Sequence, residues 1–279
     1  MSITAATKWP TNAEMIVDIV ELGYIRPNDS VIDLTFGGGK WWTLYAHAGL
    51  FVANVDPGDD TLQISRRLNG LEVLGIERDF RDLGDMGSIG PHGGLFDVVV
   101  FDPPYVSMGG RATSTMPEFM GRYGLENAAT TPELLQADNE RGLAEAYRIC
   151  KPGGLVLAKC APYISSGVRK EGDWWTRDAA LAMGFEIHDM LIHVGDVRAQ
   201  PKDGPCRKCN GTGRVMTRPG RTVINEPDLL MIDDPEFGPC EKCAGSGRIP
   251  RKVKHARNNF SVLFILRKPA PRKTRKKAT

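Results

Sequence analysis

The chain has 279 residues, of which 41% are hydrophobic and 25% charged, and its formal net charge is +2. These values are typical of a globular protein with one sizeable core and room for an inserted segment. They argue against a membrane protein, since no apolar run approaches the length of a membrane span and the first residues lack a signal-peptide pattern. We therefore expect a cytoplasmic protein without a membrane partner.

A glycine-rich loop follows the first predicted strand. Residues 30–34 form a short apolar run, which leads into Gly37, Gly38 and Gly39 and then into a helix-like segment, Lys40–Ala48. Glycines at this place let the backbone approach a ligand closely and open a helix N-terminus toward it. One glycine loop is weak evidence, so the interpretation depends on the residues at the ends of the later strands.

Acidic residues follow the next two predicted strands. Residues 50–55 end at Asp56, the position where nucleoside-binding α/β domains hold the ribose hydroxyls. Residues 71–76 lead to Asp79 and Phe80, which we expect beside an adenine ring. Asp56 alone would be interpreted as a solvated turn residue, so the order of loop and acids carries the prediction.

The most informative stretch is Asp102-Pro103-Pro104-Tyr105. It follows residues 96–101, a continuous apolar run that is typical of a buried parallel strand. Ligands of parallel sheets bind beyond the carboxyl ends of the strands. There the Asp102 carboxylate and a carbonyl of the stiff proline turn can accept the two N–H groups of an exocyclic amine, and Tyr105 can stack on the base. The alternative is an ordinary rigid turn after a strand.

Further core elements are predicted downstream. Residues 106–132 have little periodicity, and a loop of this length indicates a mobile flap over the base pocket. A Lys-Pro-Gly-Gly turn at 151–154 precedes a buried strand at 155–159. We expect a helix at 173–183, a strand at 185–194 and a last strand at 259–267.

Together these motifs resemble those of class I S-adenosylmethionine-dependent methyltransferases, and within them the DNA amino-methyltransferases of the gamma group. Residues 33–39 resemble the first motif of that group, residues 102–105 its fourth motif, and the turn at 151–154 is common in the wider class. The resemblance implies an α/β, Rossmann-like fold with a seven-stranded, mostly parallel sheet and an antiparallel last strand. It also implies S-adenosylmethionine as the cofactor, held by Asp33, Gly37, Gly39, Asp56, Asp79 and Phe80.

The implied reaction is direct methyl transfer to the N6 amine of adenine in DNA. Asp102, Pro103 and Pro104 would hold the amine, Tyr105 would stack on the base, and the base would be flipped out of the duplex. Three alternatives stay open: the same chemistry on RNA, transfer to cytosine N4, and a zinc-ribbon nucleic-acid binder on a relic methyltransferase fold. The sequence does not indicate an oligomeric state.

Two cysteine knuckles lie between the last two predicted core strands. Cys206 and Cys209 begin a CxxCxGxG pattern that recurs at Cys240 and Cys243. Four thiolates suit tetrahedral Zn²⁺, and the glycines allow backbone amides to face the sulfurs. Disulfide and redox roles are disfavoured, because we expect a cytosolic chain and the two copies match each other. The knuckles resemble the zinc domain of DnaJ-type chaperones, and two repeats imply one structural zinc ion.

The chain is therefore predicted to have four parts. Residues 1–198 form the methyltransferase core, 199–256 the zinc-ribbon insertion, 257–268 the last core strand and 269–279 a basic disordered tail. Between residues 202 and 257, twelve side chains are basic and seven acidic, with five of the acids between the knuckles. We expect the insertion to recognise DNA, or RNA in the alternative reading. The competing interpretation is a zinc clip that only stabilises the hairpin.

Overall fold

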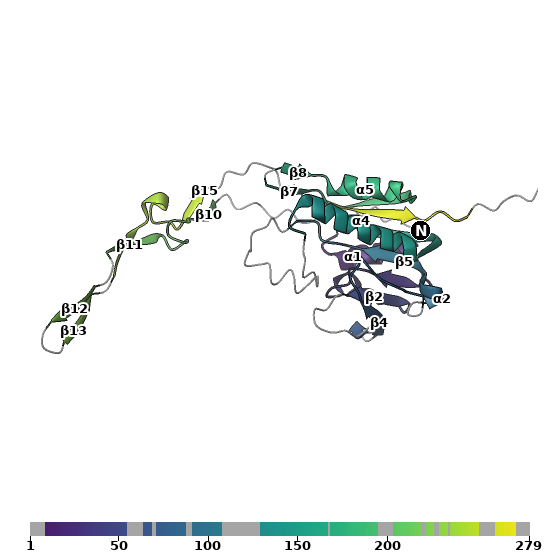
Figure 1. Cartoon of the computed structure of the whole chain (residues 1–279), viewed down its shortest axis with the longest axis horizontal. Coiled ribbons are helices and arrows are strands. Elements are labelled where there is room, and N and C mark those ends of the chain that lie inside the picture. The colour runs from purple at the N-terminus through teal and green to yellow at the C-terminus, as the bar shows by residue number, and fades with distance from the viewer. Residues whose placement is uncertain are drawn as a thin grey trace, which may run out of the picture. The chain divides into compact units, whose positions relative to one another are not determined.

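The protein divides into two compact units, shown in Figure 1. The sheet unit comprises Met1–Asp196 and Asn258–Thr279, and the cysteine unit comprises Val197–Arg257. This computed structural model describes residues 9–54, 64–68, 71–87, 91–107, 129–166, 168–194, 203–218, 221–225, 229–233, 235–250 and 260–271. Asp56, most of the predicted flap and most of the predicted basic tail lie outside the described residues.

The sheet unit is built on one eight-stranded sheet with the order β3-β4-β2-β1-β5-β6-β16-β9. Its strands are β1 (Val31–Asp33), β2 (Leu50–Asn54), β3 (Ile64–Leu68), β4 (Leu71–Glu77), β5 (Phe96–Phe101), β6 (Cys150–Cys160), β9 (Glu186–Val194) and β16 (Phe260–Arg267). The strands from β4 to β6 are parallel, whereas β16 runs antiparallel to both β6 and β9. The predicted Rossmann-like class I methyltransferase fold is confirmed. An additional edge strand, β3, runs antiparallel to β4 and was not predicted.

Hydrophobic clusters cover both faces of this sheet. Along β5, Val99 and Phe101 belong to one cluster, whereas Val98 and Val100 belong to the other. This division arises because successive side chains of a strand point to opposite faces. With both faces buried, every position of β5 can be apolar, which confirms the interpretation of its continuous apolar run.

Helices supply the outer layers. Helices α4 (Pro132–Ile149) and α5 (Gly172–Ala182) pack on the face of Phe101, through residues such as Leu143 and Ala180. Helix α1 (Asn12–Glu21) packs on the opposite face through Ile16 and Ile19. Shorter elements are η1 (Lys40–Trp42), α2 (Pro91–Gly94), β7 (Tyr163–Ser165) and β8 (Val168–Lys170).

The first turn of α1 is fixed by a capping box. The backbone N–H of Thr11 donates to the Glu14 carboxylate at 2.8 Å, and the backbone N–H of Glu14 donates to the Thr11 hydroxyl at 3.4 Å. These bonds satisfy two N–H groups that a helix leaves without partners at its start. They also fix the position of Asn12, the first helical residue.

The predicted helix over Lys40–Ala48 is wrong, because only the single turn η1 forms there. Trp41 and Trp42 are both buried, and their indole N–H groups donate to Asp102 and Asp33 at the ends of two different strands. These hydrogen bonds satisfy both indole N–H groups within one short turn. Residues 43 and 44 are exposed, so the segment lacks the apolar stripe that would hold a longer helix against the sheet.

The cysteine unit lies in sequence between β9 and β16, which pair with Val194 opposite Phe260. Its described residues form three two-stranded ribbons, β10–β15, β11–β14 and β12–β13, and a short turn, η2. Their bounds are β10 (Asp203–Pro205), β11 (Arg214–Arg218), β12 (Arg221–Asn225), β13 (Leu229–Asp233), β14 (Glu236–Pro239), η2 (Glu241–Cys243) and β15 (Arg248–Pro250). The four cysteines form the buried centre of this unit, with Val215 and Ile249 packed against them.

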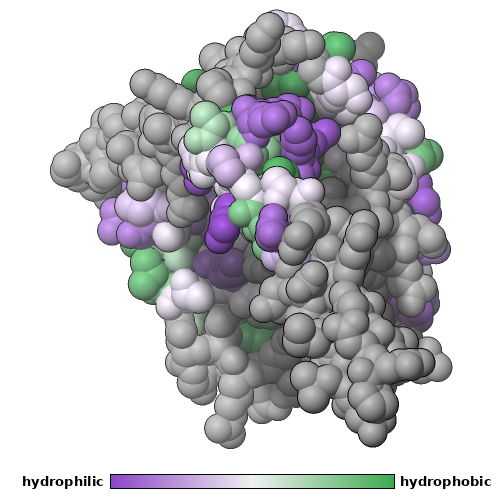
Figure 2. Space-filling model, turned by 90° about the vertical axis from the view of Figure 1, so that its left-hand side faces the viewer, coloured by the Kyte–Doolittle hydropathy of each residue, from purple (hydrophilic) through white to green (hydrophobic). Residues whose placement is uncertain are grey.

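On the face shown in Figure 2, hydrophilic and hydrophobic residues are interspersed in the coloured part of the surface. Among the described helices, none has the length and apolar character needed to cross a bilayer.

Candidate functional site

Asp102 lies at the carboxyl end of β5, beside the loop that follows β1. These two strands are neighbours, with β2 and β4 beyond β1 and β6 beyond β5. A reversal of strand order of this kind opens a crevice at the carboxyl edge, where α/β proteins bind ligands. The backbone N–H of Asp102 donates to Thr35 Oγ1 at 2.8 Å, so the predicted loop and the predicted turn are joined directly.

Three neutral side chains donate to the Asp102 carboxylate. Trp41 Nε1 lies 2.7 Å and Asn12 Nδ2 3.2 Å from Oδ2, and the Tyr105 hydroxyl bonds to Oδ1. Burial raises the pKa of the Asp102 carboxyl, and the charge of Lys159 with the Trp41 and Asn12 donors opposes that rise. Segments far apart in sequence therefore converge on one carboxylate.

The hydroxyl of Tyr105 donates to Oδ1 of the carboxylate that we expected to accept the base amine. A pocket opens beside the same turn, lined by Pro103 and Tyr105 on one side and by residues of α4 and α5 on the other. Asn139 of α4 donates from Nδ2 to the Pro104 carbonyl at 3.4 Å. A carbonyl oxygen has two lone pairs, so Pro104 keeps capacity for a second donor.

The sequence interpretation missed Lys159. This residue ends the apolar part of β6, is 5% exposed and bonds through Nζ to Asn12 Oδ1. Its Nζ also lies 5.7 Å from the centre of the Trp41 ring and 6.0 Å from that of Tyr105. Lysine is rarely buried without a partner, so a lysine inside an apolar strand was the available signal.

Asp33 ends β1, just before the glycine loop in the sequence, and is 1% exposed. Its carboxylate accepts the Thr35 backbone N–H at 2.9 Å and the Trp42 indole N–H at 2.8 Å. Burial raises the pKa of Asp33 to about 6, against the effect of these donors. In the loop that follows Asp33, Gly37 and Gly39 have φ of 52° and 67°, a region that glycine enters without steric cost. Through these two bonds, Asp33 holds the residues on either side of the glycines in place.

The residues after β4 are engaged with the protein itself. Both Asp79 oxygens accept from the Arg81 guanidinium, from Nε at 2.9 Å and from Nη2 at 2.5 Å. Phe80 is buried, and its ring centroid lies 5.6 Å from that of Phe101. Phe80 is therefore a core residue in this structure, and Asp79 is ion-paired.

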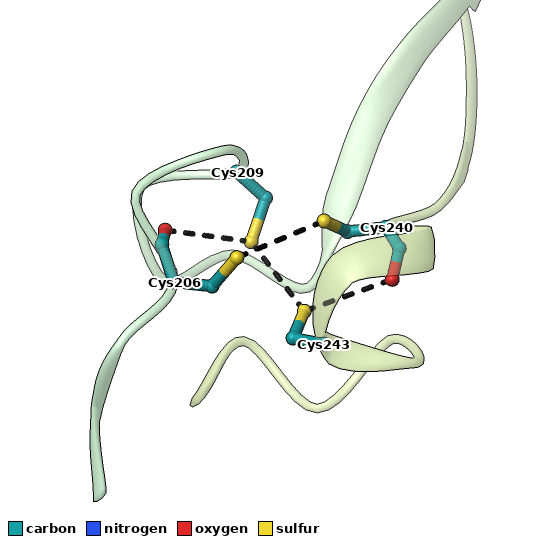
Figure 3. A group of neighbouring side chains, drawn as sticks. All are labelled: Cys206, Cys209, Cys240 and Cys243. Carbon is teal, nitrogen blue, oxygen red and sulfur yellow. Dashed lines mark hydrogen bonds between the residues drawn. The ribbon is translucent and has the colours of Figure 1, made fainter. Parts of the chain in front are cut away.

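The four cysteines of the knuckles gather in one cluster (Figure 3). All four Sγ atoms lie within 4.8 Å of one another, with Cys206 and Cys240 at 3.8 Å and Cys209 and Cys243 at 3.7 Å. These separations are too long for disulfides. A tetrahedral zinc ion with Zn–S bonds of about 2.3 Å requires S···S edges of about 3.8 Å. The cluster therefore fits the geometry of a zinc site.

Glycines hold the two knuckles together. The backbone N–H groups of Gly213 and Gly247 each donate to a cysteine sulfur, Cys209 and Cys243 respectively, at 3.3 Å. A Cβ atom on Gly213 would lie 2.1 Å from the Gly245 carbonyl oxygen, and one on Gly247 would lie 2.2 Å from the carbonyl oxygen of Gly211 in the first knuckle. The close approach of the knuckles thus requires glycine at positions 213 and 247, and the backbone N–H groups of the same two residues bond to the sulfurs.

No family model and no curated protein matches this chain. Several solved structures do, at low identity. One, from Bacillus halodurans and provisionally described as a methyltransferase, is 12% identical over 92% of this chain and 100% of its own, with a TM-score of 0.42.

Two further matches are longer proteins. An O-methyltransferase family protein from Burkholderia thailandensis is 13% identical, over 94% of this chain and 57% of its own, with a TM-score of 0.41. TrmN from Thermus thermophilus is 14% identical, over 92% of this chain and 48% of its own, with a TM-score of 0.35. This chain thus spans about half the length of these two proteins.

Proposed function

We propose that the protein is an S-adenosylmethionine-dependent methyltransferase that modifies the N6 amine of adenine in DNA. The observation that carries this proposal is the 2.7 Å contact between the Asp102 carboxylate and the Trp41 indole N–H. Trp41 closely follows the glycine loop, and Asp102 begins the turn that would accept the amine. The contact therefore supports a site in which methyl donor and methyl acceptor are neighbours.

The residues of the loop suit the cofactor. Apart from its two neighbours in the chain, no described residue has a heavy atom within 4 Å of the place where a Cβ of Gly38 would be, so a ligand can approach the backbone there. Gly37 and Gly39 would contact the cofactor, with Asp56, Asp79 and Phe80 on its ribose and adenine. Asp33 would act by holding Thr35 and Trp42 in place. When bound, the cofactor supplies an electrophilic methyl group on a sulfonium.

The chain's own residues would prepare the amine for attack. The amine nitrogen of adenine is a poor nucleophile, because its lone pair is delocalised into the ring. Asp102 Oδ1 and the Pro104 carbonyl would accept its two N–H bonds, and the charge-assisted bond to Asp102 is the stronger. The Tyr105 hydroxyl leaves Oδ1 in this step, and its ring then stacks on the flipped base. No covalent intermediate is required, and the proton that the nitrogen loses as it gains the methyl group would leave along its hydrogen bond to Asp102.

The test is transfer of a radiolabelled methyl group to duplex DNA and, separately, to total RNA. We expect incorporation into DNA by the wild type and none by Asp102→Ala, with cofactor binding retained in both. Incorporation into RNA alone would assign the RNA alternative. Cofactor binding without incorporation into any nucleic acid would favour the relic binder and overturn the proposal.

We also propose that the cysteine unit binds zinc and contacts the nucleic acid. Arg207, Lys208 and Lys242 are exposed around the knuckles, and Glu241 neutralises part of this charge, as it pairs with Lys208. Basic side chains of this kind bind phosphates and make the affinity for nucleic acid fall as the salt concentration rises.

A unit this small depends on its metal to fold. A chelator should therefore weaken DNA binding and flatten its salt dependence, while cofactor binding is kept. An unchanged DNA affinity of the metal-free protein would mean that the cysteine unit only stabilises the hairpin and does not contact DNA.

A further inference from the structure

A buried lysine lies next to the acceptor carboxylate of the proposed site. Lys159 reaches Asp102 through one intermediate: its Nζ donates to Asn12 Oδ1, and Asn12 Nδ2 donates to Asp102 Oδ2 at 3.2 Å. An ammonium group has only donors, so it can bond to the oxygen of the Asn12 amide and not to its nitrogen. This bond turns the NH₂ group of Asn12 toward Asp102.

The charges that face Asp102 come from three strands. Lys159 on β6 and His193 on β9 favour the ionised carboxylate, whereas Asp33 on β1 disfavours it. Trp41 and Asn12 contribute neutral donors. The Nε2 atom of His193 lies 2.7 Å from the Trp9 carbonyl oxygen, to which it donates, and burial lowers the pKa of this histidine, so its ring is less often charged at neutral pH. Burial lowers the pKa of Lys159 as well, and the charge of Asp102 opposes this. Because the ordinary pKa of lysine is about four units above that of histidine, Lys159 is the main positive charge facing this carboxylate among the described residues.

The charge state of Asp102 decides what it can do with an amine. An ionised carboxylate only accepts hydrogen bonds, which suits an N–H group, whereas a protonated one presents an O–H donor. Burial favours the protonated form. A nearby positive charge is thus needed to keep Asp102 in the state that the proposed reaction uses.

We infer that Lys159 is a positioning residue that keeps Asp102 ionised and, through Asn12, holds it in place as an acceptor for the target amine. Its link to catalysis rests on the proposed function. Its effect on Asp102 does not, because the charge of a carboxylate can be measured without substrate. Lys159 also lines the pocket beside Tyr105.

The direct test is infrared spectroscopy of the full-length protein at neutral pH, which detects the C=O stretch of a protonated carboxyl group. Lys159→Met has similar length and no charge, and we expect it to gain a protonated-carboxyl band beyond the small contribution of Asp33, whose pKa of about 6 leaves it partly protonated in the wild type as well. The band should be absent from the double variant Lys159→Met/Asp102→Asn, which assigns it to Asp102. Lys159→Arg keeps the charge, and Lys170→Met removes an ion-paired lysine of β8, so neither should gain the band.

The same variants give a pH profile of methyl transfer. Removing an opposite charge at close range raises a carboxyl pKa by about one to three units. The acidic limb of the kcat profile of Lys159→Met should therefore move to higher pH by about that amount, and Lys159→Arg should keep the wild-type limb. Thermal unfolding and cofactor binding show whether each variant is folded. If Lys159→Met does not fold, Asn12→Leu provides a second way to break the hydrogen-bonded link from Lys159 to Asp102.

The proposed function and the inference about Lys159 can be rejected independently of each other. If the wild type transfers no methyl group, the proposed function fails, and the infrared bands still show whether Lys159 keeps Asp102 ionised. If folded Lys159→Met has neither a new band nor a shifted acidic limb, the inference about Lys159 is wrong. An Asp102 that is protonated in the wild type would overturn it as well.

Discussion

Tyr105 offers two separable groups at the proposed site, a hydroxyl that bonds to Asp102 and a ring that can stack on a base. Tyr105→Phe keeps the ring and frees Oδ1, so kcat/KM should stay within about fivefold of wild type, the worth of about one net hydrogen bond. Tyr105→Ala also removes the stacking surface, worth about 1–3 kcal/mol, and should lose about tenfold or more. Methyl transfer measured against substrate concentration separates the two. Equal losses in both variants would assign the role to the hydroxyl and contradict stacking.

Asp33 should make the protein less stable as pH rises from about 4 to 6. Burial raises its pKa to about 6 from 3.8, so the folded state holds a proton that the unfolded state releases. The stabilisation is complete below the unfolded pKa and is lost as pH rises through the folded one. Two pKa units correspond to about 3 kcal/mol.

Asp33→Asn removes this titration, so the difference in unfolding free energy between wild type and variant should change across this pH window. Denaturant unfolding at several pH values measures it. A difference that is constant with pH would mean that Asp33 does not titrate in the folded protein as we expect.

The knuckles allow a test at the level of one structural element. Gly213 and Gly245 have the same φ, +77°, so alanine is strained equally in both. They differ in space: the Cβ of Gly213→Ala would meet a backbone oxygen at 2.1 Å, whereas that of Gly245→Ala would meet Pro239 Cβ at 3.6 Å. Gly213→Ala should therefore lose zinc binding, and Gly245→Ala should keep it with about 1–2 kcal/mol less stability. Zinc content after gel filtration is the measurement, and equal zinc loss in both would show that backbone strain alone decides.

Elements defined by local pattern could be predicted, and elements defined by tertiary contacts could not. Adjacent residues were enough to predict β5, because a continuous apolar run indicates a strand that is buried on both faces. They were also enough to predict that the four cysteines come together, because the CxxC spacing is that of a metal site. The segment Lys40–Ala48 has helix-forming residues, but the indoles of Trp41 and Trp42 find carboxylates on two strands and end the helix after one turn. Asn12 and Lys159 are 147 residues apart and meet only because α1 begins where β6 ends.

At the scale of the whole molecule, the motifs predicted the fold class through a family resemblance. The glycine loop after the first strand and the Asp-Pro-Pro-Tyr turn after β5 implied a seven-stranded, mostly parallel sheet, and the structure adds that β1 and β5 are neighbours in it. The edge strand β3 carries no motif, so nothing in the pattern predicted it. The contacts of Asp79 and Phe80 depend on α4 and Arg81, which the motif order does not specify.

The connection between the two units predicts that the sheet unit folds without the cysteine unit. Val194 and Phe260 are paired across β9 and β16, so a two-residue Asn-Gly turn can join them directly and replace residues 195–259. The shortened chain keeps both hydrophobic clusters of the sheet, so its melting temperature should fall by no more than a few degrees and its cofactor affinity should match that of the full chain.

Its affinity for DNA should fall and depend less on salt, because the basic side chains of the knuckles are gone. Titrations of labelled duplex at several salt concentrations measure this, with cofactor binding as the control for folding. An unchanged salt slope would assign nucleic-acid contact to the sheet unit alone. A shortened chain that does not fold would show that the cysteine unit contributes to the stability of β9 and β16.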